Sequence, residues 1–215
     1  MLERRSLGAA GGFTLVELIT VLAILVLLAA LSVPAVVSLQ QSDNLSSAGQ
    51  IVASQINLAR QLAATTNRSV QVRLIQVPSL APNGYCAIQI WNANLTGATG
   101  SGSTIAPTIG WTAVSRLAFL PQTAIAAYSS SANLSELLSA ANIVTGQMPT
   151  GGATSNANYY AFQISPAGLV TPSLAISSSY LSIVPARNGS GASIPANYVS
   201  IQIDPQTATA LVYRP

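Results

Sequence analysis

The sequence predicts an α+β protein, with a long helical region at the N-terminus followed by a remainder rich in β-strands. Three observations support this. Residues 18–39 form a run of 22 uncharged and mostly apolar residues. Between Leu45 and Ala63, apolar and small residues recur at steps of three and four, which is the period of an amphipathic helix. From Ser69 onward apolar and polar residues alternate, as in half-buried strands.

The apolar run at the N-terminus is long enough to span a membrane as a helix. At 1.5 Å per residue it covers about 33 Å, which matches the hydrocarbon core of a bilayer. Arg4 and Arg5 precede it, and we expect them on the cytoplasmic side. Pro34 removes one intrahelical hydrogen bond, so the run should kink there. Glu17 at the start of this run requires an explanation, because a charged side chain in a membrane-spanning segment costs free energy.

The residues alone leave two simple interpretations of this segment open. One is a cleaved secretory signal, with a small-residue cleavage site at Ala30 to Ser32. The other is a plain signal anchor. In that case "TLVE", from Thr14 to Glu17, is a capping box that explains the carboxylate locally.

The amphipathic segment that follows has one face to bury. That face consists of Leu45, Gly49, Val52, Ile56, Ala59 and Ala63. Asp43 and Asn44 indicate a small break before it, and "TTNRS" at 65–69 indicates its end. The predicted strands lie at 69–77, 85–91, 159–164, 180–184 and 198–203. "DPQT", from Asp204 to Thr207, predicts a closing hairpin, and Leu134 to Ala141 predicts a short helix capped by Asn133.

The composition narrows the class of protein. Only 6% of the 215 residues are charged, against about 25% in an ordinary soluble protein. The net charge of +3 comes from eight Arg, no Lys and five acidic residues, and the basic residues are not clustered, so nucleic acid is not expected as a partner. From Gln40 onward neutral polar residues dominate, which favours an exported or surface-exposed protein.

The chemistry-bearing residues argue against an enzyme. The chain has no His, which excludes a Ser-His-Asp triad and imidazole metal ligands. Its single cysteine, Cys86, lies in a strand-like run and is expected to be a buried small hydrophobe. The acids after the apolar run, Asp43, Glu136 and Asp204, are isolated in sequence. We therefore predict no enzymatic activity, no metal and no cofactor.

The stretch "GGFTLVEL" at residues 11–18 resembles the processing site of type IV prepilins and of the pseudopilins of type II secretion. In that family a short basic leader ends in Gly, and Glu is the fifth residue of the mature chain. The resemblance implies cleavage after Gly12 by a prepilin peptidase and N-methylation of Phe13. It also implies that Glu17 neutralises a Phe13 amine, its own or a neighbour's, during filament assembly. Pro34 falls where family members often carry a proline.

The resemblance also implies an organisation of the whole chain. Its parts would be a leader (1–12), a transmembrane or filament-core helix half (13–40), an amphipathic half (41–66) and a β-rich globular domain (67–215). The implied fold is pilin-like, with one long N-terminal helix packed on an antiparallel β-sheet globular domain. "FQISPAGLVT" (162–171) is similar to the minor pseudopilin H and FimT-like group. The terminal segment 201–215 is similar to the Verru_Chthon cassette protein D family.

The function implied by the resemblance is that of a minor pilin or pseudopilin subunit. Such a subunit crosses the bacterial inner membrane once, with its C-terminal domain in the periplasm, before it enters a filament. Its partners would be prepilin peptidase, other subunits and inner-membrane lipid. The alternative is a filament-tip module that binds DNA or polysaccharide. Its available basic residues are Arg60, Arg68, Arg73, Arg116, Arg187 and Arg214.

Overall fold

The computed structural model describes residues 12–96, 108–129, 134–139, 144–149, 156–189, 193 and 195–214. Within these ranges it does not describe the side chains at 31–35, 95–96, 108–109, 144–145, 147–149 and 156. The α-helix is α1, Leu15–Thr66, with 52 residues. The chain divides between Gln40 and Gln41 into two compact units, and each is considered by itself below.

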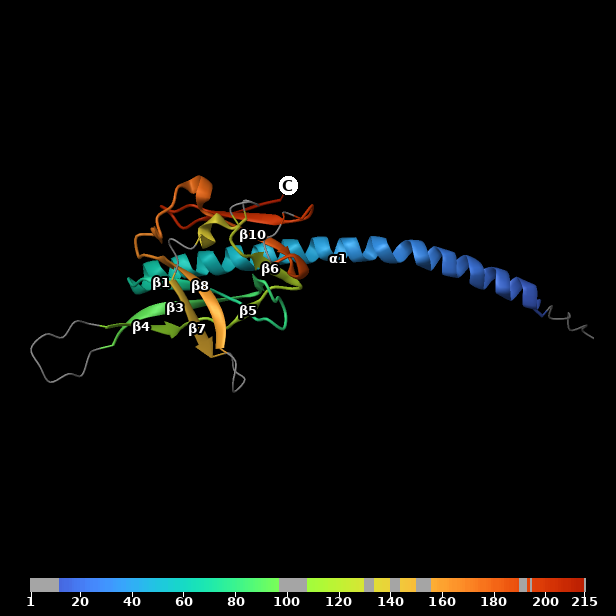
Figure 1. Cartoon of the computed structure of the whole chain (residues 1–215), viewed down its shortest axis with the longest axis horizontal. Coiled ribbons are helices and arrows are strands. Elements are labelled where there is room, and N and C mark those ends of the chain that lie inside the picture. The colour runs from blue at the N-terminus through green and yellow to red at the C-terminus, as the bar shows by residue number, and fades with distance from the viewer. Residues whose placement is uncertain are drawn as a thin grey trace, which may run out of the picture. The chain divides into compact units, whose positions relative to one another are not determined.

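The strands form two antiparallel sheets, which are drawn in Figure 1. The seven-stranded sheet has the order β4-β3-β1-β8-β7, with β5 paired to β3 and β9 paired to β8. Its strands are β1 (Val70–Ile75), β3 (Ala87–Thr96), β4 (Thr108–Ala113), β5 (Ala118–Phe119), β7 (Val144–Pro149), β8 (Asn156–Ile164) and β9 (Val170–Thr171). The five-stranded sheet has the order β12-β11-β10-β6-β2. Its strands are β2 (Gly84–Tyr85), β6 (Thr123–Ala126), β10 (Tyr180–Pro185), β11 (Val199–Ile203) and β12 (Ala210–Tyr213).

Unit 1 contains the first part of α1. Thr14 caps its start, because the backbone N–H of Glu17 donates to Thr14 Oγ1 at 3.3 Å. The large apolar side chains described between Leu15 and Leu39 are all exposed, with relative accessibilities from 46% to 75%. Pro34 lies inside α1, but its side chain falls outside the described ones, so the kink stays a prediction.

Unit 2 begins with the second part of α1, which buries the face that the sequence predicts. Leu45, Val52, Ile56, Ala59 and Ala63 are fully buried. The predicted break at Asp43 and Asn44 is wrong, since α1 runs through both positions. The predicted end is confirmed: the helix stops at Thr66, and Asn67 follows with φ of 49°. Asn is one of the few residues that adopt this left-handed conformation readily.

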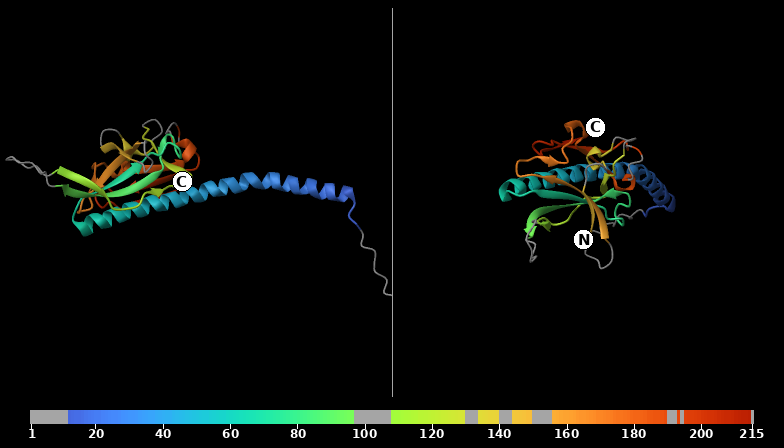
Figure 2. Two further views of the ribbon diagram at one scale, coloured as in Figure 1. Left: turned by 90° about the horizontal axis from the view of Figure 1, so that it is seen from below. Right: turned by 60° about the vertical axis from the view of Figure 1, so that its left-hand side comes forward.

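This second part of α1 lies between the two sheets in unit 2 (Figure 1; Figure 2, right). One hydrophobic core joins Ile56 of α1 to Val72 of β1, and to Leu181 of β10 and Val199 of β11. Tyr85 of β2 also contacts Tyr160 of β8 edge to face, with ring centroids 5.0 Å apart. The core is therefore shared by the helix and both sheets.

The predicted fold class is wrong. It placed one long helix, with a membrane-spanning half, on an antiparallel β-sheet globular domain, whereas the strands form two separate sheets and the helix packs against both. The predicted location, a single-pass inner-membrane protein with a periplasmic domain, is also contradicted. Among the residues that the structure describes, no helix has both the length and the apolar character needed to cross a membrane.

Most predicted strands are confirmed, but one of them is two strands. The run at 85–91 divides at Cys86, because β2 pairs with β6 in one sheet while β3 pairs with β1 in the other. Cys86 itself is 2% exposed, as expected for a small hydrophobe, and burial raises the pKa of its thiol. The chain thus passes from one sheet to the other at a buried residue.

The closing hairpin is confirmed by the pairing of β11 with β12. Asp204 Oδ1 accepts a hydrogen bond from the Gln206 N–H at 2.9 Å, and Asp204 Oδ2 accepts one from Thr207 Oγ1 at 2.7 Å. The predicted helix from Leu134 to Ala141 is corrected to a 3-10 turn at Glu136–Leu138, in which Leu137 and Leu138 are buried. Its predicted cap, Asn133, lies outside the described residues.

Candidate functional site

The residues of the predicted processing site lie in an accessible segment. Gly12, Phe13 and Thr14 directly precede α1 and are not helical. The Phe13 side chain is 81% exposed. A Cβ added at Gly12 would meet no atom within 4 Å, so nothing in the described chain crowds this position. A peptidase could therefore reach the bond between Gly12 and Phe13 without disturbing packed structure.

Glu17 lies in the first turn of α1, where a carboxylate interacts favourably with the helix dipole. The capping box is only half formed, because the N–H of Glu17 donates to Thr14 but no bond runs from the Thr14 N–H to the Glu17 carboxylate. Within the described part of the chain, the carboxylate has no ion pair or hydrogen bond. Glu17 is thus an exposed charge within a surface of apolar side chains.

The basic residues considered for a binding surface do not share one environment. Arg60, Arg68, Arg116 and Arg187 are exposed. The Arg214 guanidinium donates from Nη1 to Ser46 Oγ at 2.8 Å and also contacts Ser42 and Asn197. Arg73 differs from all of them, since it is only 7% exposed.

Arg73 belongs to a cluster that sequence reasoning missed. Its guanidinium carbon lies 3.9 Å from the centroid of the Trp91 ring and 4.4 Å from that of Tyr159. Its Nε–H donates to Gln71 Oε1 at 2.7 Å. Burial lowers the pKa of Arg73, and Tyr159 acts in the opposite direction. We call Gln71, Arg73, Trp91 and Tyr159 the Arg73 cluster.

Neighbouring groups fix the two rings of the Arg73 cluster. The Trp91 indole N–H donates to Gln89 Oε1 at 3.2 Å, and Gln89 Nε2 donates to the Ser115 carbonyl at 3.1 Å. Tyr159 lies over Gly146, its partner on β7, where an added Cβ would fall 2.6 Å from the ring carbon Cζ. Any larger residue at this position would have to displace the ring. The cluster is therefore held from both flanking strands of β1.

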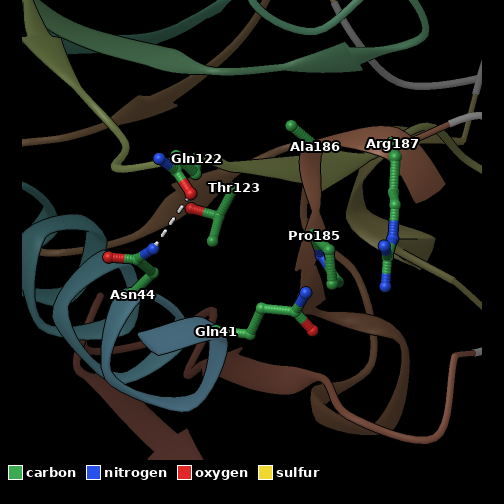
Figure 3. A pocket seen from close by; sticks show the side chains of 7 residues that line it. All are labelled: Gln41, Asn44, Gln122, Thr123, Pro185, Ala186 and Arg187. Carbon is green, nitrogen blue, oxygen red and sulfur yellow. Dashed lines mark hydrogen bonds between the residues drawn. The ribbon is translucent and has the colours of Figure 1, made fainter. Parts of the chain in front are cut away.

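A pocket of about 230 Å3 opens elsewhere in unit 2. It is lined by Gln41, Asn44, Gln122, Thr123, Pro185, Ala186 and Arg187. Figure 3 shows Asn44 and Gln122 joined by a hydrogen bond, which runs from Asn44 Nδ2 to Gln122 Oε1 at 3.4 Å. Thr123 Oγ1 is buried and makes no hydrogen bond. The lining combines amides with one guanidinium and contains no carboxylate.

The described residues contain no group of three or more His, Cys, Asp or Glu side chains that could hold a metal ion. Asp43 lies on α1, Glu136 in the 3-10 turn and Asp204 in the closing turn, and the three do not form such a group.

No protein-family model matches the chain, and neither a curated protein nor a solved structure matches it. Functional inference therefore depends on the residues themselves.

The signal for the Arg73 cluster was present in the sequence but incomplete. The alternation in "VQVRLI" puts Gln71 and Arg73 on the polar face of a half-buried strand. Trp91 and Tyr159 join that face only through the register of β1 with β3 and β8, where Gln71 pairs with Trp91 and Arg73 with Ala161. The periodicity of a sequence cannot predict that register, because it does not show which strands pair.

Proposed function

We propose that the chain is a subunit of a type II secretion pseudopilus or a type IV pilus-like filament, matured by prepilin peptidase cleavage after Gly12. The observation that carries this proposal is the match of residues 11–18 to the prepilin processing site, with Glu17 in the fifth place after the cleaved bond. The exposure of Phe13 and the free space around Gly12 support it, because a peptidase requires an accessible segment.

The exposed apolar surface of the first part of α1 supports assembly with other subunits. Leu15, Val16 and Leu27 are 75%, 69% and 66% exposed. Exposed apolar surface of this kind is a typical interaction surface. Burying it against the same segment of neighbouring subunits would be favourable by about 25 cal/mol per Å2 of apolar surface. Such burial would form the apolar centre of a filament.

The Glu17 carboxylate would set the register of that assembly. It is the one acidic group in the described part of unit 1, and it has no partner there. Taking an unpaired carboxylate out of water is costly, whereas pairing it with an amine offsets that cost. The amine released at Phe13 by cleavage is the partner that the proposal supplies. A subunit packed out of register would leave both charges unpaired.

The cleavage step is tested by co-expressing the full chain with a prepilin peptidase and measuring the intact mass and N-terminal sequence. We expect a mature chain that begins at Phe13. Gly12→Val should abolish cleavage without altering folding, because the added side chain has open space in the chain itself. A mature N-terminus at any other residue would contradict the proposal.

The assembly step is tested by Glu17→Gln, which keeps the side chain's size but removes its charge. The variant should be cleaved normally and should be lost from sheared or purified filaments. Thr20→Val is a matched control, because it changes another polar side chain in the same segment, one that bonds only to the Val16 and Glu17 carbonyls. Normal incorporation of the Gln variant would rule out the role assigned to Glu17.

A further inference from the structure

The Arg73 cluster contains a buried cation that no acid among the described residues neutralises. The acids of the chain are Glu3, Glu17, Asp43, Glu136 and Asp204. The four that lie in the described ranges form no ion pair with Arg73. Residues outside those ranges contribute only Glu3, from the segment ahead of Gly12. A charge removed from water without a counter-ion is normally avoided in folded proteins.

The cluster fixes the guanidinium but leaves part of it available. Gln71 accepts from Nε, and the rings of Trp91 and Tyr159 pack against the guanidinium carbon. The two Nη groups make no hydrogen bond with any described residue. They are also not among the buried polar atoms sealed from solvent. The geometry therefore presents an oriented pair of N–H donors at a small opening in the sheet surface.

We propose that the Arg73 cluster binds one carboxylate group supplied from outside this chain. A planar guanidinium donates two parallel hydrogen bonds to a carboxylate, and this pairing is stronger and more directional than that of an ammonium group. The cluster contains a single cation, so a singly charged carboxylate neutralises it, whereas a doubly charged phosphate would leave excess negative charge. The contacts with the rings and Gln71 mean that little side-chain entropy is lost on binding.

The carboxylate can come from a small molecule or from an acidic side chain of a protein. A second copy of this chain is one protein source, because Asp43 on α1 is exposed and could be presented to it. The chemistry at Arg73 is the same in each case. The inference is independent of cleavage at Gly12, since the cluster lies wholly within unit 2.

The test is a titration of the isotopically labelled full chain, followed through the Arg73 Nε–H and Trp91 indole N–H signals in NMR spectra. The probes are acetate, an end-blocked peptide with one Glu, and the same peptide with Gln. We expect a saturable shift of both signals. Arg73→Lys should weaken binding at least about tenfold, because it keeps the charge but loses the paired donors, and Arg73→Gln should abolish it. Arg116→Gln, which removes an exposed guanidinium, should leave binding unchanged.

The three probes of the titration distinguish the possible sources of the carboxylate. Saturation by acetate as strong as that by the Glu peptide indicates a small acid, whereas tighter binding of the Glu peptide with no binding of the Gln peptide indicates a protein partner. Self-association that acetate and Asp43→Asn both reduce indicates a second copy. Shifts that fail to saturate, or that persist unchanged in Arg73→Gln, would overturn the proposal.

Discussion

The two parts of α1 differ both in apolar content and in the exposure of their apolar side chains. Ile56 in the second part is fully buried between two sheets, whereas Ile24 in the first part is 57% exposed. The second part carries its apolar residues on one face, while the first part is apolar all round. A helix with one apolar face can bury that face against its own domain. A helix that is apolar on all sides can bury its surface only if apolar groups surround it. The large apolar side chains described in the first part of α1 are therefore left exposed, whereas the second part buries its apolar face in the core of unit 2.

The largest expected effect comes from truncating the matched isoleucines. Ile56→Ala should lower the free energy of unfolding of unit 2 by about 2–5 kcal/mol, because it leaves a cavity in the shared core. Ile24→Ala should change it by less than about 0.5 kcal/mol, because the side chain is largely exposed. Denaturant unfolding followed by near-UV circular dichroism of both variants measures the difference. Equal destabilisation by the two changes would show that the first part of α1 is also packed within the chain.

A smaller loss of stability should result from changing the residues that flank α1 at its two ends. Asn67→Ala should cost about 1 kcal/mol in the global stability of unit 2, because Ala adopts the left-handed conformation at φ of 49° less readily. Thr14→Ala should cost a similar amount locally, by removing the cap on the Glu17 N–H, but should leave the global value unchanged.

Thermal unfolding and amide hydrogen exchange together distinguish the two cap variants. Asn67→Gly is the control, since Gly tolerates the left-handed conformation and should restore most of the stability. Faster exchange confined to the first turn is expected for Thr14→Ala. A global loss of stability in that variant would mean that the start of α1 is coupled to the sheets.

Most of the helices and strands could be predicted from the sequence, but the way in which they assemble could not. The stripe from Leu45 to Ala63 was readable because helical period depends only on neighbours along the chain. The division into two sheets could not be predicted, because a period of two shows which side chains share a face but not which strands pair. Cys86 illustrates this limit: it lies within one apolar run, yet the strands on either side of it find different partners.

The same limit applies to the candidate sites. Gly12, Phe13 and Glu17 could be singled out because the motif is local. The Arg73 cluster could not, since it requires Trp91 and Tyr159, which are distant in sequence, and the absence of a side chain at Gly146. A site assembled across three strands becomes visible only when their register is known.

The smallest expected effect is a dependence of the closing hairpin on acid pH. Hydrogen bonds from the Gln206 N–H and Thr207 Oγ1 hold the pKa of Asp204 below its ordinary value. Because the folded-state pKa is depressed, the stabilisation is present above the unfolded pKa of about 3.9 and is lost as the pH falls through the folded value. The protection factors of the amides in β11 and β12, which correct for the slower intrinsic exchange in acid, should therefore fall on acidification below about pH 4. Asp204→Asn should remove most of this dependence, because its side chain does not titrate. Exchange within the first part of α1 should not follow Asp204, since that part lies in the other unit. An unchanged acid response in Asp204→Asn would assign the effect to another carboxylate.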